Sequence, residues 1–258
     1  LQTGAETIEQ KVGIRTISVE DGKILINGKQ VKFRGVNRHD SNPYTGATVT
    51  REDVIRDLQL MKESNVNAIR TSHYPNAPYF PELCNEYGFY MIAEADLESH
   101  GVGTLYTNDG HDCMGYIAQD DAWAESILDR QKRNVIRDKN QSAVIFWSLG
   151  NESGYGGNFE DAGRWVKAYD PTRLLHYEAS IYNSAGYHND VSMLDVMSRM
   201  YADTEWVKEY CEDRRMRKPF IQCEFIHAMG NGKYTLKAVR RGKNGWGKAG
   251  VNDTTAPF

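Results

Sequence analysis

Short apolar runs alternate with amphipathic stretches along most of the chain. The runs are typical of strands, and the stretches between them repeat their apolar positions every three or four residues, as helices do. The predicted strands span residues 31–37, 67–72, 89–93, 144–149, 174–177, 196–200 and 220–224. The predicted helices begin at Thr50 and span residues 78–87, 121–138, 158–169 and 205–214. This alternation predicts an α/β fold with a parallel sheet, and its strand count is one short of a closed (β/α)₈ barrel.

The helix that begins at Thr50 carries a clear start signal. Thr50 and Asp53 have the spacing of a capping box, in which each side chain accepts a hydrogen bond from the other residue's backbone. Val54, Leu58 and Met61 follow at helical spacing and predict one buried face.

The two ends of the chain differ from this pattern. Residues 14–30 alternate between apolar and polar positions around Asp21-Gly22 and Asn27-Gly28, which predicts a small hairpin before the main domain. Residues 233–258 are rich in lysine and glycine and hold no apolar run long enough for a buried strand. We therefore expect a TIM (β/α)₈-type barrel that lacks its eighth strand.

Composition and charge narrow the range of partners. The chain of 258 residues is 40% hydrophobic and 26% charged, as in a folded globular protein. Its net charge of −4 gives no electrostatic reason to expect nucleic acid, and no apolar stretch approaches the ~18 residues of a membrane span. The four cysteines have no zinc-site or C-x-x-C spacing, which favours reduced thiols and a cytoplasmic location. The start lacks both a signal segment and methionine, and we interpret it as cut from a longer protein.

Polar residues gather where six of the predicted strands end. Because functional sites of parallel α/β folds lie at the carboxyl ends of the strands, these residues are expected to share one rim. The runs are Asn37–Asp40, Ser72–Asn76, Glu94–His100, Gly150–Ser153, Met200–Tyr201 and Glu224–His227.

Two glutamates, Glu152 and Glu224, follow strongly apolar strands. A protonated carboxyl that acts as an acid and an ionised carboxylate that attacks a sugar carbon form the retaining glycosidase arrangement, with the groups ~5–5.5 Å apart. The alternative, that each is a solvated residue at a strand end, is less probable for the pair than for either residue alone.

A second group of residues has the chemistry of a cation site. Glu98 and His100 are two positions apart, so on an extended segment both project to one side, where Glu152 can join them. Two carboxylates with one imidazole suit Mg²⁺ or Mn²⁺ better than zinc. The spacing alone is equally consistent with a salt-bridged or capping pair in a loop.

Three histidines at strand ends, His39, His73 and His227, can donate hydrogen bonds to sugar hydroxyls. A lone histidine at a strand end is more often a structural hydrogen-bonding residue. His111, His176 and His188 are assigned no role.

Five ordered segments together resemble the catalytic barrel of glycoside hydrolase family 2 β-galactosidases. They are Arg34–His39, Arg70–Asn76, Leu97–Gly101, Trp147–Ser153 and Cys223–Asn231, and the similarity runs from about Gly13 to Gly232. β-Glucuronidases and β-mannosidases share some of these elements. The His-Ala-Met-Gly-Asn run and the Glu-Ser-His pair resemble the β-galactosidase branch.

The resemblance implies a retaining β-galactosidase that hydrolyses β-galactosides such as lactose by double displacement. It implies that Glu152 is the acid/base and Glu224 the nucleophile. It also implies that Glu98, His100 and Glu152 bind Mg²⁺, with Mn²⁺ as a substitute and a monovalent cation as a further cofactor. The residues implied in contacts with the galactosyl ring or the transition state are His39, His73, Asn151, Tyr201 and His227.

The resemblance further divides the chain into three parts. Residues 1–16 resemble the end of a preceding immunoglobulin-like β domain, residues 17–232 the barrel, and residues 233–258 form a divergent tail. Full-length members of the family carry more β domains and are often oligomeric. They also have an eighth strand with a sugar-stacking tryptophan, which this tail does not resemble.

Two other hypotheses stay open beside the enzyme. One is a catalytically inactive, truncated barrel fragment that at most binds sugar or complements a partner, and the missing eighth strand favours it. The other is a metal-dependent hydrolase barrel. That design typically needs a His-x-His pair on the first strand, where His39 stands alone.

Overall fold

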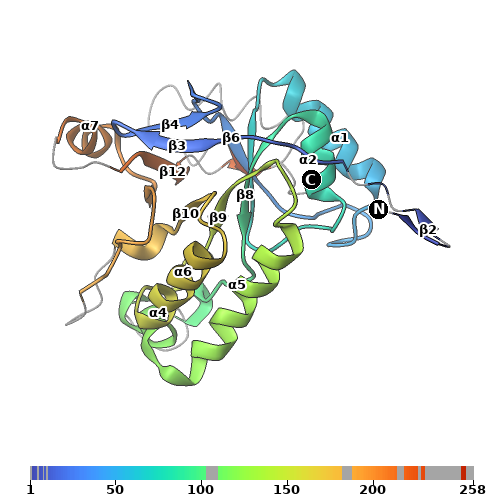
Figure 1. The fold of residues 1–258 in the computed structure, drawn as a ribbon. Helices are drawn as coiled ribbons and strands as arrows, with labels where there is room; N and C mark the ends of the chain where they lie inside the picture. Colours follow the sequence, from blue (N-terminus) through green and yellow to red (C-terminus); the bar gives the residue numbers. More distant parts are fainter. Residues whose placement is uncertain are drawn as a thin grey trace.

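The computed structural model describes residues 2–4, 6–7, 9, 11–102, 110–181, 188–213, 218–225, 228–229 and 251–253. Its centre is a parallel sheet with helices packed around it (Figure 1). The main strands are β6 (Gly35–Arg38), β7 (Ala68–Thr71), β8 (Tyr90–Glu94), β9 (Val144–Ser148) and β10 (Leu174–His176), which are neighbours in chain order. Strands β11 (Met197–Met200) and β12 (Phe220–Glu224) form a separate parallel pair. All seven predicted strands are therefore present, as a partial barrel.

The pair β11–β12 continues the order of the main strands. The backbone N–H of Asp195 donates to the carbonyl of Leu175 at 3.0 Å, and the His176 ring lies 2.8 Å from the Ser198 hydroxyl. These contacts place β11 beside β10. The carboxyl ends of all seven strands therefore face a common region.

Helix α1 (Arg51–Glu63) confirms the predicted start signal. Asp53 donates its backbone N–H to the Thr50 hydroxyl at 3.2 Å, and Thr50 donates its own to the Asp53 carboxylate at 2.9 Å. Val54, Leu58 and Met61 are buried, as predicted.

The other helices surround the sheet. They are α2 (Phe80–Tyr87), α4 (Gly110–Gln119), α5 (Ala124–Asp138), α6 (Gly157–Tyr169) and α7 (Thr204–Glu212). Helix α5 is preceded by the 3₁₀ turn Asp121–Trp123, and a second 3₁₀ turn, η2 (Glu178–Ile181), follows β10. Helix α4 was not predicted, because its short sequence contains two glycines that lower helix propensity.

The predicted hairpin is a three-stranded antiparallel sheet of β3 (Ile17–Glu20), β4 (Lys23–Ile26) and β5 (Lys29–Gln30). Asp21-Gly22 and Asn27-Gly28 all have positive φ, the mark of type I′ turns, whose twist matches that of the flanking strands. Ile24 and Ile26 are buried in a cluster with side chains of β9, β10 and the segment before β11, namely Ile145, Phe146, Leu174 and Val196.

The ends of the chain add four short strands. Strands β1 (Gln2–Thr3) and β2 (Glu6–Thr7) form an antiparallel pair. Strand β14 (Val251–Asp253) pairs in parallel with β13 (Ala228–Met229) and meets β6 at Asp253 and Asn37. The sequence did not predict β14, because three residues with one apolar side chain carry no periodic signal. The expectation that the tail supplies no eighth strand is therefore wrong in part, because this three-residue strand from the tail pairs in parallel beside β6.

The side of the barrel between β6 and β12 holds a large cavity. Its volume is about 820 Å³, and its lining includes apolar side chains from both sides, among them Phe33, Val36, Val207, Phe220 and Ile221. Asn37 donates from β6 to the Cys223 carbonyl on β12 at 3.1 Å. The cavity thus lies between the first and the last of the seven predicted strands.

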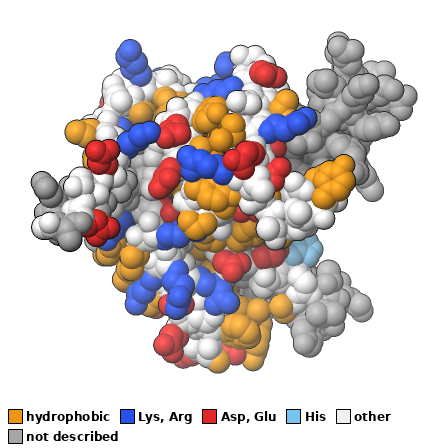
Figure 2. All heavy atoms as spheres, turned by 90° about the vertical axis from the view of Figure 1, so that its right-hand side faces the viewer, with side chains coloured by type: hydrophobic (Ala, Val, Ile, Leu, Met, Phe, Trp, Pro, Cys, Tyr) orange, Lys and Arg blue, Asp and Glu red, His pale blue; other side chains and the backbone are white. Residues whose placement is uncertain are grey.

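Acidic and basic side chains are interspersed over most of the face shown in Figure 2, in keeping with the small net charge. Among the described residues, no helix combines the length and apolar character needed to cross a bilayer.

Candidate active site

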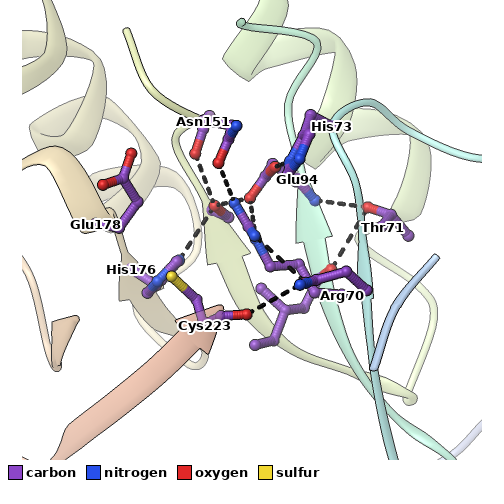
Figure 3. A network of polar contacts seen from close by, with 12 residues as sticks. Arg70, Thr71, His73, Glu94, Asn151, His176, Glu178 and Cys223 are labelled. Carbon is purple, nitrogen blue, oxygen red and sulfur yellow. Dashed lines mark hydrogen bonds and ion pairs between the residues drawn. The ribbon is translucent and has the colours of Figure 1, made fainter. Parts of the chain in front are cut away.

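Arg70 lies at the centre of the polar strand ends and joins four segments (Figure 3). Its guanidinium donates to the carboxylate of Glu94 at 2.6 Å, to that of Glu224 at 3.0 Å and to the side-chain oxygen of Asn151 at 2.8 Å. Arg70 and Glu94 are buried in the sheet. Neither residue was assigned a role from the sequence, although a charge inside an apolar strand signals a buried partner.

Glu224 is held by two donors. Its Oε1 accepts from Arg70, and its Oε2 accepts from the Tyr201 hydroxyl at 2.7 Å. The His73 Nε2 lies 3.6 Å from Oε1. Partial burial, then the hydrogen bond to Glu224, raises the pKa of Tyr201, so its hydroxyl stays a donor. The Arg70 guanidinium and the Tyr201 hydroxyl thus fix the position of this carboxylate, as a nucleophile requires.

Glu94 contacts both Arg70 and His73, the two residues beside Glu224 Oε1. Burial alone would raise its pKa, but the Arg70 guanidinium and the hydrogen bonds from His73 and Ser148 bring the pKa of Glu94 down to about 2. His73 Nδ1 lies 2.7 Å from Glu94 Oε1, which fixes the imidazole beside Glu224. Glu94 is therefore a buried anion that balances Arg70 and orients His73.

The segment after β9 places Glu152 on the same rim. Gly150 has a φ of +146°, and a Cβ there would lie 2.8 Å from the Leu97 carbonyl oxygen, so only glycine fits. The next residue, Asn151, donates its backbone N–H to that carbonyl at 2.8 Å and its side-chain amide to Glu98 at 2.5 Å. Glu152 then has a φ of +41°, which is uncommon for a residue other than glycine.

Glu98, His100 and Glu152 form a cluster with the chemistry of a divalent-cation site. Their ligand atoms all lie within 4.8 Å of one another, and His100 Nδ1 is 2.5 Å from Glu152 Oε2. Burial, together with the charge of Glu152, raises the pKa of Glu98, while the contact with Glu152 raises the pKa of His100. A hard cation would relieve the crowding of the two carboxylates, so this oxygen-rich set fits Mg²⁺ or Mn²⁺.

Four of the five residues expected to contact the sugar lie in this region. His73 and Tyr201 flank Glu224, and Asn151 contacts Arg70. His39 packs edge-to-face on His73 with ring centroids 5.5 Å apart. The fifth, His227, lies outside the described residues.

Two further buried groups lie behind the rim, on the side of Arg70 opposite His73 (Figure 3). His176 lies between the hydroxyls of Ser148 and Ser198, at 3.2 and 2.8 Å, and burial followed by the charge of Arg70 lowers its pKa to about 3. Burial raises the pKa of Glu178 to about 8. Neither residue was assigned a role from the sequence. The sequence signal for each is a polar residue in an otherwise apolar run, which does not by itself indicate a function.

Comparison with known proteins gives consistent results. Residues 17–241 match the family model described as "Glycosyl hydrolases family 2, TIM barrel domain". The chain is 49% identical over 252 residues to a protein named beta-galactosidase from Actinobacillus pleuropneumoniae, covering 90% of this chain and 25% of that protein. It is 44% identical over 239 residues to a Staphylococcus xylosus beta-galactosidase, covering 92% of this chain and 24% of that protein. The chain thus spans about a quarter of the length of these curated relatives.

Solved structures resemble the fold. A β-glucuronidase from Ruminococcus gnavus superposes with a TM-score of 0.70 at 21% identity, covering 96% of this chain and 48% of that one. A β-D-glucuronidase from Dictyoglomus thermophilum gives a TM-score of 0.65 at 24% identity, covering 96% of this chain and 47% of that one. At this identity the likeness shows a shared fold alone.

Proposed function

Because the chain belongs to glycosyl hydrolase family 2, as its TIM-barrel domain, we propose that it is the catalytic barrel of a retaining β-galactosidase. The relatives at 49% and 44% identity are named beta-galactosidase, which supports a galactoside over a glucuronide as substrate. The observation that carries the proposal is the pair of hydrogen bonds that Arg70 and Tyr201 donate to Glu224, on the rim where Glu152 also lies.

In the first step, Glu224 attacks the anomeric carbon of the galactoside. The electron pair of the glycosidic bond moves to the leaving oxygen, which takes a proton from the Glu152 carboxyl. The hydrogen bonds from Arg70 and Tyr201 hold the Glu224 carboxylate in place before the attack. The products of this step are the free aglycone and a galactosyl ester of Glu224.

In the second step, Glu152, now a carboxylate, takes a proton from a water molecule that attacks the same carbon. The ester bond to Glu224 breaks, galactose leaves with retained configuration, and both glutamates return to their starting states. His39, His73 and Asn151 are proposed to hold sugar hydroxyls during both steps, and His227 is proposed for the same role by resemblance.

We also propose that Glu98, His100 and Glu152 hold one Mg²⁺ or Mn²⁺. Their donor set fits such an ion, and a bound cation would supply positive charge beside the acid/base carboxyl. A monovalent cation, lactose as a natural substrate, assembly into oligomers and a cytoplasmic location remain proposals of the same kind. Among the described residues, Cys84, Cys211 and Cys223 are free thiols, which favours the cytoplasm.

The test is to trap the covalent intermediate. We expect a 2-deoxy-2-fluoro-β-galactoside with an activated leaving group to add one fluorogalactosyl mass, mapped to the peptide that contains Glu224. Glu224→Gln is the control and should not be labelled. Labelling of another residue, or turnover of a chromogenic β-galactoside by Glu224→Gln at the unmodified rate, would contradict the proposal.

A second candidate is the inactive fragment that binds sugar or complements a partner. The cavity of about 820 Å³ between β6 and β12 favours it, because an incompletely closed barrel gives the site less support. In the labelling experiment this candidate predicts sugar binding with neither label nor turnover.

A further inference from the structure

Glu178 lies beneath the segment that carries Glu152, and the proposed chemistry does not use it. It is the first residue of η2, directly after β10 and Tyr177, and it is 1% exposed. Its Oε1 accepts the backbone N–H of Glu152 at 2.8 Å. A buried carboxyl is costly to place in a protein interior, so its contact with this particular amide needs a reason.

The amide that Glu178 holds belongs to an unusual backbone position. Glu152 has a φ of +41°, in the left-handed region that L residues rarely occupy. Such a conformation persists only where the surrounding structure imposes it. In the segment after β9, the carboxyl of Glu178 satisfies the N–H of that residue directly.

The neighbouring residues are fixed by other partners. On one side, Asn151 donates its backbone N–H to the Leu97 carbonyl at 2.8 Å. On the other side, the Tyr177 hydroxyl donates to the Gly154 carbonyl at 2.8 Å. The segment is therefore anchored before and after Glu152, and Glu178 supplies the anchor at Glu152 itself.

We propose that Glu178 is a positioning residue that holds the backbone of Glu152 in its left-handed conformation and so aims the Glu152 side chain at the leaving-group oxygen. The inference rests on the proposed function of Glu152 as the acid/base. Glu178 itself touches neither substrate nor reacting atoms. Its function requires only an acceptor oxygen at this place, so a glutamine in the same position supplies it equally well.

The first experiment compares leaving groups. Glu178→Ala leaves the Glu152 amide without its acceptor, and we expect kcat/KM to fall ~10- to 100-fold for lactose, part of the ~10²–10⁴ that general acid–base catalysis contributes. For a dinitrophenyl β-galactoside, which leaves without protonation, the fall should stay within ~3-fold. Glu178→Gln should restore the unmodified ratio between the two substrates.

A destabilised control separates positioning from loss of folded protein. Val166, which is 0% exposed on α6, is outside the proposed machinery, and Val166→Ala should lower the unfolding temperature while leaving the ratio between the substrates unchanged. Equal losses on both substrates in Glu178→Ala, as in this control, would overturn the proposal.

Amide hydrogen exchange tests the anchor independently of turnover. In the unmodified chain and in Glu178→Gln, the amide of Glu152 should exchange slowly. In Glu178→Ala its exchange should become at least ~10-fold faster, and this increase should exceed the change at neighbouring amides. Unchanged exchange in Glu178→Ala overturns the inference whether or not the chain is active. Absence of turnover in the unmodified chain, with the exchange pattern as expected, would instead reject the proposed function.

Discussion

Arg70 and Glu224 are separated by 154 residues in the sequence, yet Nη1 of one donates to Oε1 of the other at 3.0 Å. The same guanidinium also donates to Glu94 and Asn151. One buried cation thus contacts the proposed nucleophile and links it to the segment that carries the proposed acid/base.

Replacing the Arg70 guanidinium should lower both the stability and the activity of the protein. Arg70→Met leaves the buried carboxylate of Glu94 without its charge partner, and we expect the free energy of unfolding to fall by about 3–5 kcal/mol. Urea denaturation measures this loss. Arg70→Lys, which retains a charge but not the planar fork, should be intermediate, and equal stability of all three proteins would contradict the assignment.

The two proposed catalytic glutamates should respond differently to substitution. Glu224→Gln removes the nucleophile and should reduce turnover by several orders of magnitude. Glu152→Gly should lose the acid and base steps but recover part of its rate with azide on an activated galactoside, yielding a β-galactosyl azide. Azide rescue of the Glu224 variant alone, with a β-azide product, would reverse the roles.

Metal removal should affect the pH profile as well as the rate. A cation held by Glu98, His100 and Glu152 interacts electrostatically with the proposed acid/base, so EDTA treatment should lower turnover and shift its pH dependence. Added Mg²⁺ should restore both, and less so in His100→Ala. A metal-free enzyme with an unchanged profile would contradict the site.

His176 should contribute to acid lability. Its pKa is lowered by burial to about 3 in the folded chain, against ~6.5 when exposed, so below pH ~6.5 the unfolded state binds a proton that the folded state does not. The contribution of neutral His176 to the free energy of unfolding is therefore complete above pH ~6.5. It is lost as the pH falls toward 3, with an upper bound of about 5 kcal/mol. His176→Gln cannot titrate, and its free energy of unfolding should lose less between pH 7 and 4. Parallel pH curves for the two proteins would reject the prediction.

The open side of the barrel should limit stability. Strand β14 meets β6 at one residue pair in the described part of the chain, and the cavity of about 820 Å³ lies beside it. Each unpaired buried backbone group costs ~1–3 kcal/mol against a total of ~5–15 kcal/mol. We expect the isolated chain to unfold at low temperature or to self-associate, and to show a reduced but measurable turnover. A monomer in sedimentation with a cooperative transition above ~50 °C and full galactosidase activity would contradict this expectation.

Local signals in the sequence determined most of the elements. The capping box at Thr50 and the turns at Asp21-Gly22 and Asn27-Gly28 depend on residues that are neighbours in the chain, so their chemistry can be read directly. The apolar runs likewise predicted all seven strands. They also indicated the rim, because parallel strands bring their carboxyl ends to one edge.

The pairing of the polar residues, in contrast, depends on how distant segments come together in the fold. The partners of Arg70, His176 and Glu178 come from other segments of the chain, and neither composition nor periodicity records a contact between distant segments. Helix α4 and strand β14 were missed for the related reason that neither has a strong local pattern. Local patterns in the chain thus indicate the kinds of groups on the rim. Folding selects their neighbours and, through burial and charge, shifts the pKa values of buried groups such as His176 and Glu178.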